Sequence, residues 1–309
     1  MRASDGLLLA DKGPGLTSFQ VVAHVRRVLR APKVGHGGTL DPMATGVLPL
    51  LLGAATKLTP YLFDRDKEYV ATVRLGVSTD SLDATGRVIA ERPVPALDEG
   101  DLRAVLARFV GEIEQVPPMF SAVHVRGRRL YELARAGQEV ERRPRRVRVD
   151  AIDLLAWTPP ALTIRLACGK GTYVRSLAAD LGQALGSGAH LAALRRTRVG
   201  PFRVEDAVPW EILRAGDAAV LVPRIVAADR AVSHLPAVRL HQAAARRLGQ
   251  GQRVDPASCP APWPSGLCRL YADDRFLGIG EAGPGGLRAL RLLSTLGHAD
   301  HQGPRPVSS

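Results

Sequence analysis

The chain of 309 residues carries 42 lysine and arginine residues against 30 aspartate and glutamate residues, a formal net charge of +12. A basic excess of this size indicates a polyanionic partner, nucleic acid rather than membrane, with an uncommitted basic surface as the alternative. Three cysteines without a CxxC spacing argue against a disulfide framework or a zinc ribbon and favour the cytoplasm. No apolar run reaches the roughly 20 residues of a membrane span, and the start lacks the apolar core of a signal peptide.

The first third of the chain predicts short buried strands and amphipathic helices. We expect strands at residues 6–12 and 46–53, a helix over 16–30 with a cap at Thr17 or Ser18, a short helix within 54–63, and an alternating strand over 68–76. A second capped helix follows over 97–111.

The middle of the chain predicts two long strands, 145–157 and 161–169, joined through Pro159 and Pro160, and then a helix over 172–186 that ends at a glycine. Strands and helices mix without a regular βαβ rhythm, which favours an α+β fold with a mixed, largely antiparallel sheet. The composition changes near residue 232, so we expect a small β-rich domain over about 234–295 and a disordered tail over 296–309.

Several familiar site types are excluded. The "ACGKGT" segment fails the phosphate-loop pattern, because Ile164 stands where the first glycine belongs. No GxGxxG follows a strand, and neither HExxH nor the deaminase pattern of HxE with PCxxC occurs. His298 and His301 form the only close histidine pair, and we interpret them as solvated residues of the tail.

Residues 124–148 hold nine arginines against three glutamates. Charge runs are usually solvated faces, but here Tyr131 and apolar residues interleave with the arginines, and arginine favours phosphate forks and base stacking. We favour RNA or DNA contact over a solvated face. The segment 194–203, "LRRTRVGPFR", adds four arginines to the same expected contact.

Asp41 lies in the small-sided segment "GHGGTLDPMATG" at residues 35–46. An aspartate before proline is common in turns, and that is the simplest interpretation. However, the glycines at 35, 37 and 38 would let the backbone approach a ligand closely, and His36 offers a flat polar ring. The composition suits a site that admits a planar group.

Six stretches together resemble the TruB family, the bacterial tRNA pseudouridine-55 synthases. They span roughly residues 6–205 in family order: "DKGPGLTS", "VGHGGTLDPMATGVLPLLLGAATKL", "KEYVATVRLGVSTDSLDATG", "QVPPMFSAVHVRGRRLYELARAG", "GKGTYVRSLAADLG" and "AHLAALRRTRVGPF". The resemblance implies a pseudouridine synthase fold with the catalytic domain at 1–232, a basic RNA-binding insertion at about 120–150, and a PUA-like RNA-binding domain at 234–295.

The resemblance implies an isomerase that uses neither cofactor nor metal. Asp41 matches the family nucleophile, which attacks covalently and later leaves. In the reaction the bond from ribose to nitrogen 1 of the flipped uracil breaks, the base rotates, and a new bond to the ribose forms through carbon 5. Tyr69 is expected to stack on the base and is a candidate for taking the proton from carbon 5. Arg175 should pair with Asp41 and lower its pKa, and its two-residue spacing from Tyr173 puts both on one side if the chain is extended there.

The remaining candidate residues bind substrate by resemblance. His36 matches the histidine that helps to hold the flipped nucleotide, and further candidates are Tyr173, Leu194, Lys12, Asp83, Arg126, Arg128 and Arg129. We expect a monomer that acts on the T-arm stem-loop of tRNA, without a membrane partner. The alternatives are a guide-RNA-dependent synthase for ribosomal RNA and an RNA-binding protein that assists tRNA folding.

Four positions depart from the family pattern. Gly37 stands where threonine or alanine is frequent, and Gly13 where proline is usual. Phe120 replaces a frequent tyrosine and His124 a frequent lysine. None of these changes removes a proposed catalytic group.

Overall fold

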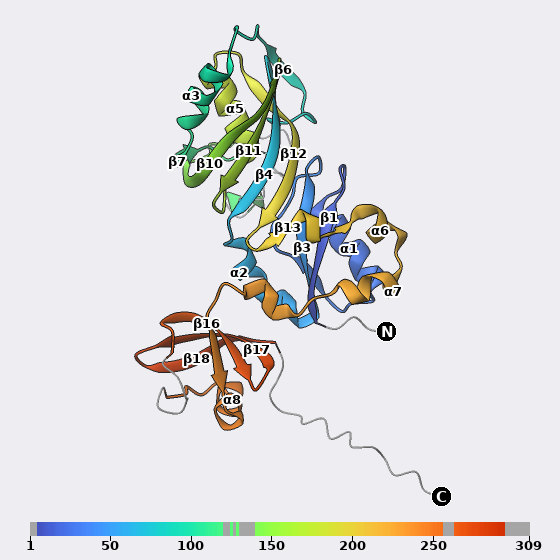
Figure 1. Cartoon of the computed structure of the whole chain (residues 1–309), viewed down its shortest axis with the longest axis vertical. Coiled ribbons are helices and arrows are strands. Elements are labelled where there is room, and N and C mark those ends of the chain that lie inside the picture. The colour runs from blue at the N-terminus through green and yellow to red at the C-terminus, as the bar shows by residue number, and fades with distance from the viewer. Residues whose placement is uncertain (1–4, 120–123, 126–127, 130–139, 256–262, 294–309) are drawn as a thin grey trace, which may run out of the picture.

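The computed structural model describes residues 5–119, 124–125, 128–129, 140–255 and 263–293. Its main domain is built on one large sheet with the strand order β14-β1-β3-β12-β4-β11-β10-β7 (Figure 1). These strands are β14 (Val208–Pro209), β1 (Gly6–Lys12), β3 (Thr45–Leu52), β12 (Ala189–Val199), β4 (Lys67–Leu75), β11 (Ala161–Cys168), β10 (Arg145–Thr158) and β7 (Gly111–Gln115). Two short strands lie off this path, β2 (Val34–His36) on β3 and β13 (Phe202–Arg203) on β12.

The expected α+β fold with a mixed, largely antiparallel sheet is confirmed. Within this sheet only the β1–β14 and β3–β12 pairs of the described strands are parallel. The predicted strands at 6–12, 46–53, 68–76, 145–157 and 161–169 all occur, with bounds shifted by a residue or two. A smaller hairpin, β5 (Val77–Thr79) with β6 (Val88–Glu91), follows β4.

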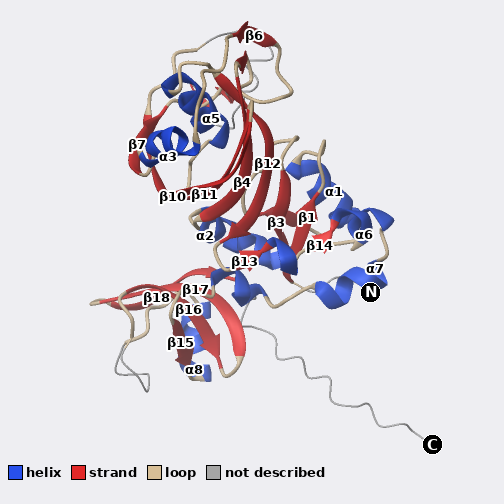
Figure 2. Cartoon of the chain, turned by 45° about the horizontal axis from the view of Figure 1, so that its top comes forward, coloured by secondary structure: helices blue, strands red, loops and turns tan. Residues whose placement is uncertain are grey.

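Helices on one face of the sheet bury their apolar stripes against it. Helix α1 (Ser18–Val28) begins with a capping box, in which Thr17 caps the helix and Gln20 bonds back to it, and Val21 and Val25 are buried. Helix α3 (Glu99–Ala107) is capped by Asp98, and α5 (Val174–Ala184) follows the β11 turn. Figure 2 shows α3 and α5 together beside the strands at the β7 end of the sheet, with α1 and α6 (Trp210–Ala215) beside β1.

The opposite face carries a second apolar cluster. It includes residues of two 3-10 helices, η1 (Gly53–Leu58) and η4 (Ala228–Val232), and of the short helix α2 (Thr59–Phe63). Strand β1 shows the division, because Leu8 and Ala10 belong to the first cluster while Leu7 belongs to the second. The period-two alternation of a strand thus feeds two separate cores.

Strand β12 was not predicted, and it corrects one expectation. The segment 194–203 was interpreted as an arginine-rich RNA contact, yet β12 runs through most of it between β3 and β4. Arg196 has no exposed surface at all. Arg195 pairs with Asp11 at 2.7 Å and is half exposed. Within this run of arginines, Arg196 therefore lies in the protein interior and Arg195 at the surface.

A small β domain follows the main domain. It comprises β15 (Ala237–Leu240), α8 (Gln242–Gly249), β16 (Gly266–Ala272), β17 (Arg275–Gly283) and β18 (Gly286–Leu292), with an apolar core of its own. Ile279 of β17 joins the second cluster of the main domain, and the Tyr271 hydroxyl donates to Asp229 Oδ2 at 2.8 Å. The two domains thus meet through apolar and polar contacts at the edge of the second cluster.

Only part of the expected basic insertion is described. The backbone pairs β8 (His124–Val125) with β9 (Arg128–Arg129), so these two arginines lie on a hairpin strand. Arg126, Phe120 and the tail at 296–309 lie outside the described residues. Among the residues that are described, no helix is long and apolar enough to cross a membrane.

Candidate active site

The loop that carries Asp41 leads from β2 into β3, beside the start of α1. Its backbone is held by Ser18, whose Oγ accepts from Leu40 N at 2.9 Å, and by Gly15 N, which donates to Pro42 O at 2.8 Å. The Asp41 side chain is 32% exposed. The loop therefore presents a partly accessible carboxylate on a backbone that other elements hold in place.

Arg175 contacts both oxygens of Asp41. Its Nε lies 2.8 Å from Oδ2 and its Nη2 donates to Oδ1 at 3.1 Å. This is the ion pair that the family resemblance implied, but the local geometry differs from the extended chain considered for Tyr173 and Arg175. Tyr173 is extended at the N-cap of α5, whereas Arg175 is already in the first turn of the helix. The guanidinium therefore reaches Asp41 from a helix start, in the two-point geometry that fixes a carboxylate most firmly.

Burial reverses the net shift of the Asp41 pKa, although Arg175 lowers that pKa as expected. Burial raises the pKa of Asp41 above its usual value, and this outweighs the lowering by the Arg175 guanidinium. The negative charge of Asp83 raises it further. Arg175 thus orients the carboxylate and offsets only part of the cost of removing it from water.

Asp83 stands behind Arg175 and anchors it. Its Oδ2 lies 3.7 Å from Arg175 Nη1, which also donates to Ser81 O at 3.2 Å. Asp83 Oδ1 in turn accepts from the Ser81 hydroxyl at 2.7 Å and from the Thr85 hydroxyl at 2.6 Å. A chain of polar contacts therefore runs from the β5–β6 hairpin through Asp83 and Arg175 to Asp41.

Tyr69 lies on β4 and is buried in the first cluster. Burial raises the pKa of Tyr69 to about 12, although the neighbouring Arg196 lowers it through its charge and a hydrogen bond. The phenol is therefore held neutral near neutral pH. Leu194 of β12 pairs with Ala71 of β4, so its buried side chain shares the face of Tyr69.

Arg196 is the site residue that sequence reasoning missed. In the register of β12 it lies between Gly46 of β3 and Tyr69 of β4. Arg195 and Arg198 are also arginines of the same run, so composition alone could not show that Arg196 is the buried one. A strand assignment for 189–199 would have placed Arg196 on the same face as Leu194 and so pointed to burial.

The other sequence candidates surround this centre in different ways. His36 ends β2 and is half-buried, and burial lowers its pKa, with a smaller contribution from Arg196. Tyr173 is half-buried, and its backbone N donates to Gln115 Oε1 at 2.8 Å. For Arg128 and Arg129 the structure describes the backbone alone.

Lys12 differs from the expected substrate contact. It is fully buried, and its ammonium donates to Leu16 O at 2.7 Å, Gly13 O at 3.0 Å and Pro42 O at 3.1 Å. Burial lowers its pKa to about 8. Because Pro42 directly follows Asp41, Lys12 holds the loop from beneath instead of facing a ligand.

Three glycines in and around the loop, Gly13, Gly37 and Gly46, lie close to other parts of the protein. A Cβ at Gly46 would overlap the carbonyl oxygen of Arg196, and its φ of 107° suits glycine. A Cβ at Gly37 would come within 2.9 Å of Leu62 Cδ1, and one at Gly13 within 2.9 Å of Trp210 Cδ1. Gly37 therefore allows the backbone to lie close to Leu62, and not to a ligand as the sequence suggested.

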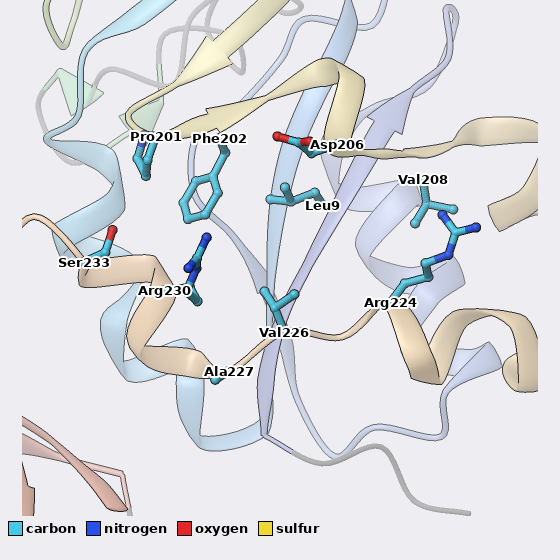
Figure 3. Close-up of a pocket in the computed structure, with 10 residues that line it drawn as sticks. All are labelled: Leu9, Pro201, Phe202, Asp206, Val208, Arg224, Val226, Ala227, Arg230 and Ser233. Atoms are coloured by element: carbon cyan, nitrogen blue, oxygen red, sulfur yellow. The ribbon is translucent and has the colours of Figure 1, made fainter. Parts of the chain in front are cut away.

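A pocket of about 560 Å³ lies elsewhere, between β1, β13 and the segment 224–233 (Figure 3). Leu9, Phe202 and Val226 form part of its apolar wall, with Arg224 and Arg230 at its edge. It belongs to the side of the sheet that carries the second cluster, and none of the candidate residues lines it. Among the described residues, no group of three or more His, Cys, Asp or Glu side chains could hold a metal ion.

Comparison with family models identifies three consecutive matches. The model of the TruB family pseudouridylate synthase N-terminal domain covers residues 26–174, and that of the tRNA pseudouridylate synthase B C-terminal domain covers 175–233. A model of the C-terminal domain of pseudouridine synthase II TruB covers 236–293. Together they span most of the chain.

Comparison with curated proteins and solved structures agrees with these matches. The chain is 51% identical to the tRNA pseudouridine synthase B of Aromatoleum aromaticum, over 96% of each chain. It is 48% identical to that of Chromohalobacter salexigens, over 94% of this chain and 95% of the relative. A chain in the crystal structure of a Cbf5-Nop10-Gar1 complex is similar to this chain at 31% identity and a TM-score of 0.70, and the match covers 90% of this chain and 78% of that chain. A chain in the structure of an H/ACA RNP bound to a substrate RNA is similar at 27% identity and a TM-score of 0.72, and the match covers 94% of this chain and 85% of that chain.

Proposed function

Because the chain belongs to the TruB family of pseudouridylate synthases, we propose that it converts uridine 55 in the T-arm loop of tRNA to pseudouridine, without a guide RNA. The observation that carries the proposal is the Asp41 carboxylate, partly exposed and held at both oxygens by a buried arginine. The relatives named tRNA pseudouridine synthase B support tRNA as the substrate.

In this proposal Asp41 is the covalent nucleophile. Arg175 orients both carboxylate oxygens, while the exposed third of the side chain leaves an approach for the uridine. Burial makes the ionised carboxylate less well solvated than in water, and a less solvated anion is a better nucleophile. Asp83 keeps Arg175 aimed at Asp41.

Tyr69 receives the extruded base. Extrusion from a stacked loop costs a few kcal/mol, and stacking on an aromatic ring returns roughly 1–3 kcal/mol. The raised pKa of Tyr69 favours this stacking role over proton acceptance, because a neutral phenol is a poor base. His36 and Tyr173, both half-buried, are proposed to border the nucleotide, and Leu194 to pack beside Tyr69.

The arginine-rich insertion supplies the remaining binding energy through the RNA backbone. Its residues Arg126, Arg128 and Arg129 are proposed to contact phosphates of the T arm. Binding should therefore weaken steeply as salt concentration rises. We propose that the enzyme acts in this way as a monomer in the cytoplasm, and that the chemistry requires neither cofactor nor metal.

The decisive test replaces the nucleophile. Asp41→Asn is expected to bind a T-arm stem-loop within a few-fold of wild type and to form no pseudouridine, since an amide cannot attack and leave as a carboxylate does. Glu99→Gln, at a surface ion pair of α3, is the matched control and should remain active. Pseudouridine formed by purified Asp41→Asn would refute the assignment of the nucleophile. Mass spectrometry of treated total RNA gives the modified positions.

Guide-dependent action is the second candidate, because the two solved structures described above come from Cbf5 and H/ACA assemblies. The near full-length relatives at 48–51% identity favour the stand-alone enzyme. Product formed on a bare stem-loop, with no second RNA present, supports the proposal, while a strict requirement for a guide would overturn it. If Asp41→Asn restored every defect of a deletion strain, a role in tRNA folding without chemistry would be favoured instead.

A further inference from the structure

Arg196 occupies an unusual place for a charged side chain. It is fully buried at the centre of the main sheet, on β12 between β3 and β4. Its guanidinium donates three hydrogen bonds, from Nε to Val47 O at 2.9 Å, from Nη2 to Gly38 O at 3.0 Å and from Nη1 to Thr39 O at 3.3 Å. None of the ion pairs found among the described residues includes it. Backbone carbonyls therefore satisfy this buried cation.

The three carbonyls that accept from Arg196 lie on both sides of the Asp41 turn. Gly38 and Thr39 immediately precede the Asp41 turn, and Val47 lies in the strand that follows it. In the sheet register Arg196 also pairs directly with Tyr69 of β4. One side chain thus holds both ends of the Asp41 loop and lies opposite the aromatic residue on the neighbouring strand.

We propose that Arg196 is a positioning residue, which fixes the Asp41 loop and the Tyr69 ring in one constellation and does not itself touch the RNA. The inference rests on the proposed function, in which Asp41 attacks and Tyr69 stacks. With no exposed surface, Arg196 acts only through the groups it holds. Its loss should therefore impair the chemical step while leaving the RNA-binding surface in place.

The backbone around Arg196 is built to accept a guanidinium. Gly38 has a φ of 142°, and a Cβ there would lie 3.4 Å from Arg196 Nη1, so glycine allows the Gly38 carbonyl to face the side chain. Lys67 lies nearby, with its Cε 3.8 Å from the same Cβ position, and its ammonium donates to Arg65 O at 2.6 Å. A planar guanidinium donates in several fixed directions at once, which a lysine ammonium cannot reproduce at the same acceptors.

The experiment compares Arg196→Met and Arg196→Lys with Leu106→Ala, a buried variant of α3 in the same apolar cluster but outside the site. Arg196→Met should lower kcat on the stem-loop about 100-fold, the scale expected for a misplacement near 1 Å, with KM changed less than about threefold. Arg196→Lys should recover part of kcat. Leu106→Ala should lower the melting temperature but leave kcat near wild type.

Each outcome decides the inference. If the kcat of Arg196→Met equals that of Leu106→Ala, Arg196 is only structural and the proposal is overturned. If KM rises and kcat does not change, Arg196 contributes to RNA binding and the proposal is again overturned. Should Arg196→Met fail to fold, Arg196→Lys carries the test, and wild-type kcat in that variant overturns it. Combined with Tyr69→Phe, the Arg196→Lys effect on kcat should be less than multiplicative, because the two residues are paired across β12 and β4 and act on the same part of the site. An inactive wild type would instead refute the proposed function.

Discussion

Two buried arginines border the candidate site, and they are compensated in opposite ways. Arg175 lies between the carboxylates of Asp41 and Asp83. Arg196 donates to three backbone carbonyls and pairs with Tyr69 across the sheet. Carboxylates gain and lose protons, whereas carbonyls do not. The region around Arg175 can therefore respond to pH and take part in chemistry, while the region around Arg196 is a fixed frame.

This contrast separates the expected effects of mutation. Changes near Arg175 should alter rate and pH dependence with modest effects on folding. Changes to the frame around Arg196 should alter stability and the position of the Asp41 loop. Four substitutions test this division.

Arg175→Met should have the largest effect. It removes the group that orients both oxygens of Asp41, so kcat/KM should fall about 1000-fold, the scale of losing a preorganised charge at a reacting centre. The pKa of Asp41 should rise further, because the guanidinium is the main group that lowers it. Single-turnover assays over a range of pH measure both quantities. A variant within tenfold of wild type would show that Asp41 needs no such partner.

Gly46→Ala tests the frame. An added methyl group would overlap the Arg196 carbonyl oxygen at a positive φ, so we expect about 3 kcal/mol of lost unfolding free energy in urea titration. Gly186→Ala is the control, since Gly186 has a φ of 77° but open space around its Cβ position. That control should lose about 1 kcal/mol. Equal losses in both variants would exclude close packing against Arg196 as the cause.

Asp83→Asn tests the carboxylate side more finely. At neutral pH, kcat/KM should fall about tenfold because Arg175 loses its second anchor. The pKa of Asp41 should fall at the same time, because Asp83 raises it. Activity requires ionised Asp41, so the acid limb of the pH–rate profile should move to lower pH. A limb that moves to higher pH would show that lost contact with Arg175 outweighs the removed negative charge.

Gly37→Ala should have the smallest effect. Its Cβ would lie 2.9 Å from Leu62 Cδ1 and 3.1 Å from Leu62 Cβ, and the leucine must shift to admit it. We expect about 1 kcal/mol of lost stability by urea unfolding, with little change in kcat. The double variant with Leu62→Val should lose less than the sum of the two single changes. Strict additivity would mean that the two residues do not compete for space.

Prediction from the sequence succeeded where local pattern carries the information. The capping box of α1, the alternation of β4 and the buried character of β1 follow from neighbouring residues alone. The Asp41–Arg175 pair was also found, but by family resemblance, since 134 residues separate the two in the chain. Strand β12 was missed because its arginines resemble a solvated basic run, and pairing with β3 and β4 overrides that composition.

The local sequence patterns determined most of the elements and the α+β class, and the resemblance to the TruB family pointed to Asp41 and Arg175. Only the tertiary structure decided the sign of the Asp41 pKa shift, because desolvation depends on every element packed around the group. It also decided which arginine of the 194–203 run is interior, and that Gly37 approaches Leu62 instead of a ligand. Burial and close contact join residues far apart in the chain, so no local pattern specifies them.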